Sequence, residues 1–134
     1  MTSSDEPFGS ESHLSELKGV SVLVVEDTWP VAKALKGVLE QLGMHVIGPT
    51  ATTADARRLV ASQAPIVALV DVNLKQEMAG DLIDELHERG IRVIIVSGYA
   101  VPPVSMEKAA AFVQKPFNGK ELVAALRAAV GRLH

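Results

Sequence analysis

Short apolar runs, most of them rich in β-branched residues, recur along the chain and are separated by segments of mixed polarity. The runs cover residues 20–25, 44–47, 66–70, 91–96 and 110–113. Continuous apolar runs of this length are typical of strands that are buried on both faces, as in a parallel sheet. The pattern therefore predicts five strands.

Between these runs, apolar residues recur three or four positions apart, which is the spacing of one face of a helix. This pattern predicts helices that begin at Pro30, at Thr53 or Asp55, at Asp81 and after Asn118. Asn118 and Glu121 have the spacing of a capping box, which supports the start of the last helix. The segment 98–109 contains two adjacent prolines and predicts only a short helix near 104–109, the fourth of five.

Strands that alternate with helices predict an α/β domain with a parallel sheet and helices on both faces. The alternation covers residues 19–134, and the chain length of 134 residues suits one domain. Residues 1–18 are polar and rich in Ser, Glu and Asp. We expect them to form a flexible tail, in which Leu14 and Leu17 dock weakly on the domain.

The composition excludes several classes of protein. Hydrophobic residues make up 48% of the chain, which is enough for a core and too much for a disordered chain. The net charge is −3 and no basic stripe is present, so we expect no nucleic-acid partner. The absence of cysteine excludes disulfides and thiolate metal sites. The apolar runs are too short to cross a bilayer and no signal-peptide pattern is found, so we expect a cytoplasmic protein without a membrane partner.

Polar residues follow the ends of four predicted strands. Glu26 and Asp27 follow the first run, Asp71 the third, Ser97 the fourth, and Lys115 comes after the fifth. Taken singly, each has an ordinary explanation as a helix cap, a loop acid or a surface side chain. Because the carboxyl ends of parallel strands share one edge, we expect the five side chains to lie together. Three carboxylates suit a divalent cation, and an ammonium suits a phosphoryl group.

These residues resemble the receiver domain of bacterial two-component response regulators. The resemblance covers about residues 20–133 and rests on four segments, which are VLVVED at 22–27, VDVNL at 70–74, VSG at 96–98 and FVQKPF at 112–117. It implies a flavodoxin-like (CheY-like) fold, with five parallel strands in the order 2-1-3-4-5. This fold agrees with the alternation of strands and helices.

The resemblance also implies roles for the residues of the predicted site. Asp71 would be the phosphoacceptor, and Glu26, Asp27 and Asp71 would hold Mg²⁺ together with the backbone carbonyl of Asn73. Lys115 would pair with the charge of the phosphoryl group.

Two further residues would report the phosphorylated state. The Ser97 hydroxyl would contact the phosphoryl oxygens, and Phe112 would fill the position of the aromatic switch.

The chain departs from the usual receiver pattern in three places. The loop after Asp71 lacks the usual proline, and its glycine, Gly80, comes one place late. The stretch from Ser97 to Lys115 is shorter than usual, so the fourth helix should be short or mobile. The sequence Ser97-Gly98-Tyr99 is similar to an alphaproteobacterial subgroup with a Thr-Gly-Tyr-type signature, whose members are often stand-alone proteins linked to HWE-type histidine kinases.

The resulting hypothesis is a single-domain response regulator and not an enzyme. Asp71 would accept a phosphoryl group from a sensor histidine kinase or a phosphotransfer protein, and the domain would then switch the binding of a downstream protein or act as a phosphate sink. One alternative is a receiver-like interaction module that works without phosphorylation. A less favoured alternative is a phosphohydrolase with an aspartyl nucleophile, because Asn73 replaces the second acid that such enzymes often carry.

Overall fold

A computed structural model describes residues 16–74, 77–98 and 106–131 of the chain. Five strands form one sheet: β1 (Ser21–Val25), β2 (His45–Thr50), β3 (Val67–Asp71), β6 (Arg92–Ser97) and β7 (Ala111–Gln114). Their order across the sheet is β2-β1-β3-β6-β7, and all neighbouring strands are parallel. Counted along the chain, this is the predicted order 2-1-3-4-5, and the fold class is confirmed.

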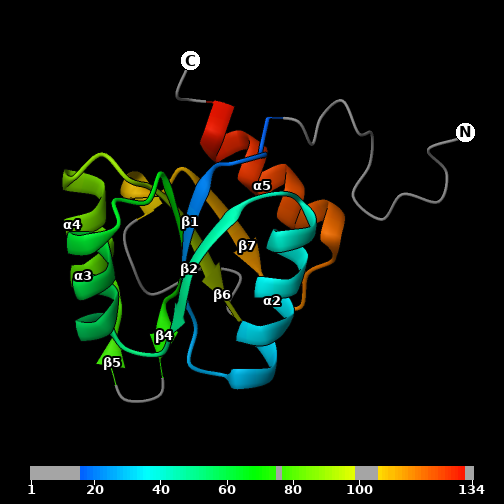
Figure 1. Cartoon of the computed structure of the whole chain (residues 1–134). Helices are drawn as coiled ribbons and strands as arrows, with labels where there is room; N and C mark the ends of the chain where they lie inside the picture. Colours follow the sequence, from blue (N-terminus) through cyan, green and yellow to red (C-terminus); the bar gives the residue numbers. More distant parts are fainter. Residues whose placement is uncertain (1–15, 75–76, 99–105, 132–134) are drawn as a thin grey trace, which may run out of the picture.

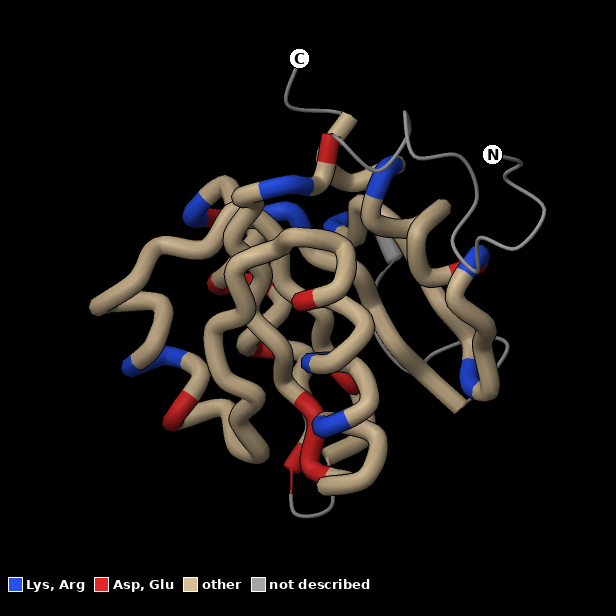
Figure 2. The backbone as a smooth tube through the Cα atoms, turned by 45° about the vertical axis from the view of Figure 1, so that its right-hand side comes forward, with Lys and Arg blue, Asp and Glu red and all other residues tan. Residues whose placement is uncertain are grey.

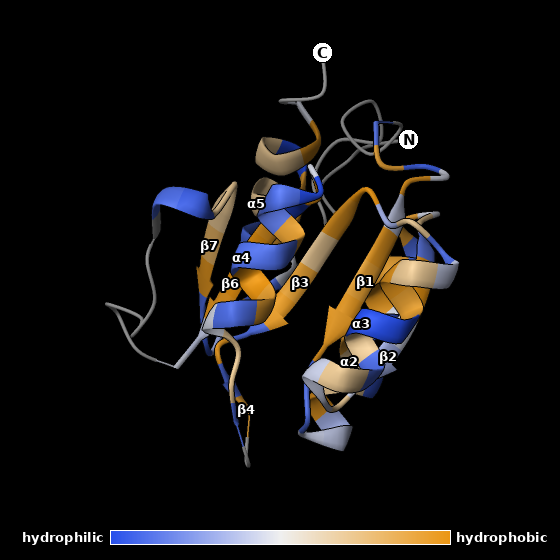
Figure 3. Ribbon diagram, turned by 90° about the vertical axis from the view of Figure 1, so that its left-hand side faces the viewer, coloured by the Kyte–Doolittle hydropathy of each residue, from blue (hydrophilic) through white to orange (hydrophobic). Residues whose placement is uncertain are grey.

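Two helices cover each face of the sheet (Figure 1). The helices α2 (Trp29–Gln41) and α5 (Gly119–Gly131) lie on one face, and α3 (Thr53–Ser62) and α4 (Gly80–Glu88) lie on the other. Alternate residues of β1 enter the two apolar clusters, Val22 and Val24 on the α2–α5 side and Leu23 and Val25 on the α3–α4 side. This burial of both faces explains the apolar runs. In Figure 3 the central strands are correspondingly orange, the colour of hydrophobic residues.

The ends of the helices follow from local sequence. The Asn118 side chain accepts a hydrogen bond from the Glu121 amide at 2.8 Å, and Glu121 accepts one from the Asn118 amide at 3.2 Å. The predicted capping box is therefore confirmed. Gly43 follows α2 with a φ of 83°, a backbone conformation that favours glycine and ends the helix.

Leu17, a residue of the predicted tail, is fully buried in the α2–α5 cluster. Close by, the Gly19 amide donates to the carbonyl of Gly43 at 2.8 Å. Residues 16–19 are therefore packed on the domain rather than weakly docked. Leu14 and the rest of residues 1–15 lie outside the described part, and the tail stays a prediction for them.

The segment after Asp71 was expected to be a loop and contains a small hairpin instead. The strands β4 (Asn73–Leu74) and β5 (Glu77–Met78) pair in antiparallel fashion, with Asn73 opposite Met78 and Leu74 opposite Glu77. Leu74 is buried in the α3–α4 cluster, which anchors the hairpin to the domain. Strands of two residues leave no periodic signal in a sequence.

The predicted fourth helix falls partly outside the described residues. Its described part is η2 (Met106–Lys108), a single 3-10 turn. Residues 99–105 lie outside the described part. None of the helices in the described residues is long and apolar enough to span a membrane.

Candidate functional site

The strand ends bring the predicted polar residues to one edge of the sheet. The Glu26 amide continues the ladder beyond β1 by donating to the carbonyl of Thr50 at 2.9 Å. The Lys115 amide does the same beyond β7, donating to the carbonyl of Ser97 at 2.7 Å. Asp71 is the last residue of β3. In Figure 2, acidic positions gather at the lower end of the tube, where the strands finish.

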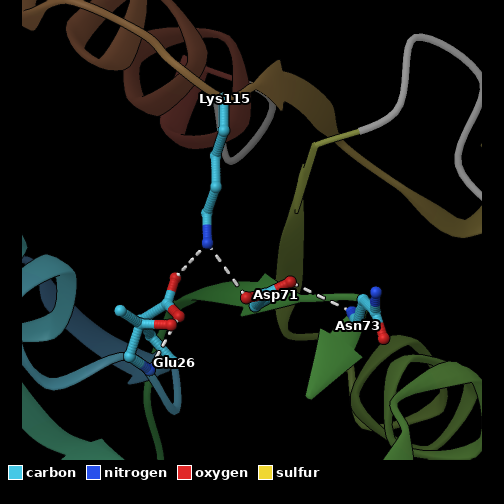
Figure 4. Close-up of polar contacts among 5 residues, drawn as sticks. Glu26, Asp71, Asn73 and Lys115 are labelled. Carbon is cyan, nitrogen blue, oxygen red and sulfur yellow. Dashed lines mark hydrogen bonds and ion pairs between the residues drawn. The ribbon is translucent and has the colours of Figure 1, made fainter. Parts of the chain in front are cut away.

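The Lys115 ammonium lies between two of the acids (Figure 4). Its Nζ is 2.6 Å from Glu26 Oε1 and 3.0 Å from Asp71 Oδ2. The side chains of Glu26, Asp71 and Lys115 are 1%, 8% and 26% exposed, respectively. Hydrogen bonds between charged groups are shorter and stronger than neutral ones, and partial exclusion of water strengthens them further.

Asp27 completes a cluster of three carboxylates. One carboxylate oxygen from each of Glu26, Asp27 and Asp71 lies within 4.8 Å of the others. Carboxylate oxygens are the ligands that Mg²⁺ prefers, and so dense a group of acids attracts a cation. The residues present therefore fit a magnesium ion, and the predicted convergence of the acids with Lys115 is confirmed.

Burial and ion pairing together raise the pKa of two groups, Glu26 and Lys115. Burial has the largest effect on Glu26 and raises its pKa, although hydrogen bonds from Lys115 and from the Thr28 amide oppose it. Burial is also the largest influence on Lys115 and lowers its pKa, but hydrogen bonds with Glu26 and Asp71 and their charges together outweigh it. The pKa of Lys115 therefore lies above its ordinary value, and the ammonium stays charged.

Backbone amides orient the two buried carboxylates. The Thr28 amide donates to Glu26 Oε2 at 3.1 Å, and the Asn73 amide donates to Asp71 Oδ1 at 3.0 Å. Each carboxylate thus has one oxygen held by an amide and the other by Lys115. The contact with Asn73 also places this residue, whose carbonyl was predicted as a ligand, directly beside Asp71 (Figure 4).

The two predicted switch residues lie at or near the same edge. Ser97 ends β6 and is fully buried. Phe112 is half-buried in β7, opposite Ile95, and packs against the α3–α4 cluster. Their switch roles stay predictions.

A groove beside the site was not foreseen from the sequence. It has a volume of about 670 Å³ and lies between α2 and the β7–α5 connection. Its lining is mostly apolar and includes Val31, Ala34 and Phe117, while Lys115 also borders it. Helical periodicity in a sequence shows which residues of α2 share an apolar face, but it does not give the distance between α2 and α5. The groove could therefore not be predicted from the sequence.

Glu77 of the hairpin was also missed. Its carboxylate accepts a hydrogen bond from the Thr53 amide at 3.2 Å, far along the chain. An acid in a polar loop is unremarkable in a single sequence.

Comparison with known proteins gives consistent results. The response regulator receiver domain family matches residues 22–127. The transcriptional regulatory protein FixJ of Azorhizobium caulinodans is 30% identical over 121 residues, which are 86% of this chain and 57% of that protein. The chain thus spans little more than half the length of this relative.

Solved structures share the fold. The response regulator PhyR from Brucella abortus has a TM-score of 0.77 and 23% identity, covering 92% of this chain and 52% of that one. A putative response regulator from Chloroflexus aurantiacus also reaches 0.77, with 22% identity over 86% of this chain and 100% of that one. A CheY-like receiver domain from Methylobacillus flagellatus reaches 0.73, with 22% identity over 83% and 98%. The family match covers most of the chain and the sheet order agrees with it, so the chain belongs to the response regulator receiver domain family.

Proposed function

We propose that Asp71 accepts a phosphoryl group from a sensor histidine kinase or a phosphotransfer protein, in a reaction that depends on Mg²⁺. The observation that carries this proposal is the position of the Lys115 ammonium between Glu26 and Asp71, beside a cluster of three carboxylates. A carboxylate that is fixed by a backbone amide and faces a cation can act as a nucleophile toward phosphorus. Membership of the receiver family supports phosphorylation-based two-component signalling.

The metal would be held by the carboxylates of Glu26, Asp27 and Asp71 and by the backbone carbonyl of Asn73. When bound, Mg²⁺ would supply positive charge toward phosphoryl oxygens. The clustering of the three carboxylates supports this assignment, because a bound cation offsets the repulsion between them.

In the transfer step, one carboxylate oxygen of Asp71 forms a bond to phosphorus while the bond from phosphorus to the donor's imidazole nitrogen breaks. The electron pair of the broken bond goes to the imidazole, which then takes a proton from water. Lys115 offsets the charge that the phosphoryl group brings, about two negative charges in the product. The chain's own contribution is mainly positioning and charge, as in other phosphoryl transfers.

After transfer, Ser97 would hydrogen-bond the phosphoryl oxygens and Phe112 would move inward with it. The burial of Ser97 at the strand end and the half-buried position of Phe112 support these roles. The changed surface would bind or release a downstream protein, or the domain would only draw phosphate from its donor. The HWE type of the kinase rests on the resemblance of Ser97-Gly98-Tyr99, in which Tyr99 lies outside the described residues.

The groove beside Lys115 supports an approach of the donor protein from the α2 side. The groove offers an apolar surface that Lys115 borders, and Lys115 contacts Asp71. Trp29 begins α2, two residues after Asp27 in the chain, and is 68% exposed. Exposed apolar surface of this kind often marks a contact with another protein.

The proposal is tested by incubating the protein with Mg²⁺ and a small phosphodonor such as acetyl phosphate, followed by intact mass spectrometry. We expect an adduct of one phosphoryl group in the wild type and none in Asp71→Asn. Asp81→Asn, which changes an exposed acid of α4 in the same way, is the matched control and should keep the adduct. No adduct from either a small donor or a phosphorylated kinase would favour the interaction module. Continuous release of phosphate from many substrates would favour the hydrolase.

A further inference from the structure

The hairpin that follows Asp71 is fastened to the start of α3 by Glu77. The Thr53 amide donates to Glu77 Oε1 at 3.2 Å, and the Thr53 hydroxyl donates to the same oxygen. The two residues are 24 positions apart in the chain. Thr53 is only 9% exposed, so this contact is sheltered from water. Figure 1 shows β5 below the lower end of α3.

The carboxylate of Glu77 suits this place because the first amides of a helix lack partners within the helix. The Thr52 side chain satisfies the Asp55 amide at 3.1 Å, and Glu77 satisfies the amide of Thr53. A negative charge near a helix N-terminus is also favoured by the helix dipole. The contact is therefore stabilising at the α3 end.

At its other end, the hairpin holds the acceptor. Glu77 pairs with Leu74 across the two strands, and the neighbouring Asn73 donates its amide to Asp71 Oδ1 at 3.0 Å. Residues 72–80 include no proline, so no fixed φ angle restricts the backbone of this segment. A ladder of two residues on each strand is weak alone, and the contact with Thr53 supplies a long-range anchor.

The anchor extends to the second helix on this face. Arg57 Nη1 donates to the Thr53 hydroxyl at 3.3 Å, and Arg57 Nε donates to Glu85 of α4 at 2.8 Å. The start of α3, the hairpin and α4 are thus joined by one set of polar contacts. Glu77 is the member that connects this set to the acceptor loop.

We infer that Glu77 is a positioning residue for the acceptor site, which holds the Asn73 backbone in place beside Asp71 by anchoring the hairpin to Thr53. The inference rests on the proposed function, since the value of a fixed Asn73 is that its amide orients the acceptor and its carbonyl would bind the metal. Glu77 does not touch the reacting atoms. Its effect on the site passes through the hairpin.

Hydrogen exchange without metal or phosphodonor tests the anchor by itself. We expect Glu77→Ala to raise the exchange rates of the Thr53 and Asn73 amides by about five-fold, as for the loss of one ordinary hydrogen bond. Glu77→Gln keeps an oxygen that can accept both hydrogen bonds and should stay near the wild type. Glu88→Ala, which removes an exposed carboxylate at the end of α4, is the control and should change neither rate. Unchanged rates in Glu77→Ala would overturn the inference.

A magnesium titration tests the consequence at the site. Trp29 is the single tryptophan of the chain and begins the helix after the acidic pair, so its fluorescence can report binding. We expect Glu77→Ala to weaken Mg²⁺ binding several-fold and Glu77→Gln to retain most of the affinity. Equal weakening in both variants would show an effect of charge rather than of position and would contradict the inference.

The two proposals fail in different ways. A wild-type protein that binds no Mg²⁺ and forms no adduct would contradict the proposed function, whatever Glu77 does. The role of Glu77 alone would be contradicted by a different result. In that case the wild type binds Mg²⁺ and forms the adduct, and Glu77→Ala has the same amide exchange rates and the same Mg²⁺ affinity as the wild type. Thr53→Val removes the hydroxyl from the other side of the contact and should reproduce part of the Glu77→Ala effect on exchange at Asn73.

Discussion

The two faces of the sheet are closed in different ways. On the α2–α5 face, an apolar groove of about 670 Å³ stays open and is bordered by Lys115. On the α3–α4 face, the hollow between the helices has only about 60 Å³. Polar contacts of Arg57, Thr53 and Glu77 join the elements of that face instead.

We propose that this difference separates two tasks, the positioning of Asp71 and the approach of another protein. The contacts of the closed face reach the loop of Asp71 through Glu77, and we propose that they hold the acceptor from that side. The open face leaves apolar surface beside Lys115, and we propose that the donor protein approaches there. The following predictions test whether the two faces differ in this way while sharing one core.

The largest effects are expected from truncating buried leucines, and they should be alike on the two faces. Leu122 of α5 and Leu82 of α4 are each 1% exposed. Leu122→Ala and Leu82→Ala should each lower the free energy of unfolding by about 2–5 kcal/mol, because each leaves a cavity in a packed core. Urea unfolding followed by circular dichroism measures both. A negligible loss on one face would show that this face is not part of a common cooperative core.

A smaller loss is expected at the site, where the contacts of both faces meet. Lys115→Met removes the cation shared by Glu26 and Asp71 and should lower the free energy of unfolding by about 1–3 kcal/mol without metal. Added Mg²⁺ should restore part of this stability, because it binds only the folded cluster. The same urea experiment with and without Mg²⁺ measures the effect.

The control for this experiment is Lys120→Met, which changes an exposed lysine near the start of α5. It should change the free energy of unfolding by less than about 0.5 kcal/mol, with or without metal. A Lys115→Met variant as stable as the wild type in metal-free buffer would mean that the ion pairs contribute nothing at the site.

On the open face, the capping box of α5 should contribute about 1 kcal/mol to the free energy of unfolding. Asn118→Ala removes the side chain that accepts from the Glu121 amide, whereas Asn118→Asp keeps an accepting oxygen there. Thermal unfolding of the two variants compares them. If both lose the same stability, the cap is not the cause.

The smallest effect is expected from the outer contact of the closed face. Arg57 and Glu85 are 43% and 46% exposed in their side chains, so solvent screens their attraction. A double-mutant cycle with Arg57→Ala and Glu85→Ala should give a coupling below about 1 kcal/mol, which falls further at high salt. A larger coupling that resists salt would place the anchor of this face at Arg57 rather than at Glu77.

The order of the elements and the edge that carries the site could be predicted from the sequence for physical reasons. Strands buried on both faces need continuous apolar runs, and these runs mark where each strand ends. The polar residues that follow must then meet at one edge, as Glu26, Asp71 and Lys115 do. These features depend on local pattern and on the geometry of a parallel sheet.

Other features depend on contacts that no local pattern encodes. Leu17 is one of two leucines in the polar stretch before β1, and its full burial follows from the space between helices that are distant in sequence. The hairpin of β4 and β5 is too short for a periodic signal and depends on Leu74 and on the contact of Glu77 with Thr53. Similarly, the groove depends on the spacing of α2 and α5.

The most direct test of the central claim is to locate the phosphoryl group on the chain. After reaction with a phosphodonor, borohydride reduction converts a phosphorylated aspartate to a stable alcohol, and peptide mass spectrometry identifies the residue. We expect modification of Asp71, with Mg²⁺ required. Modification at Asp27 or at another acid instead of Asp71, or modification of Asp71 that is equally fast without Mg²⁺, would contradict it.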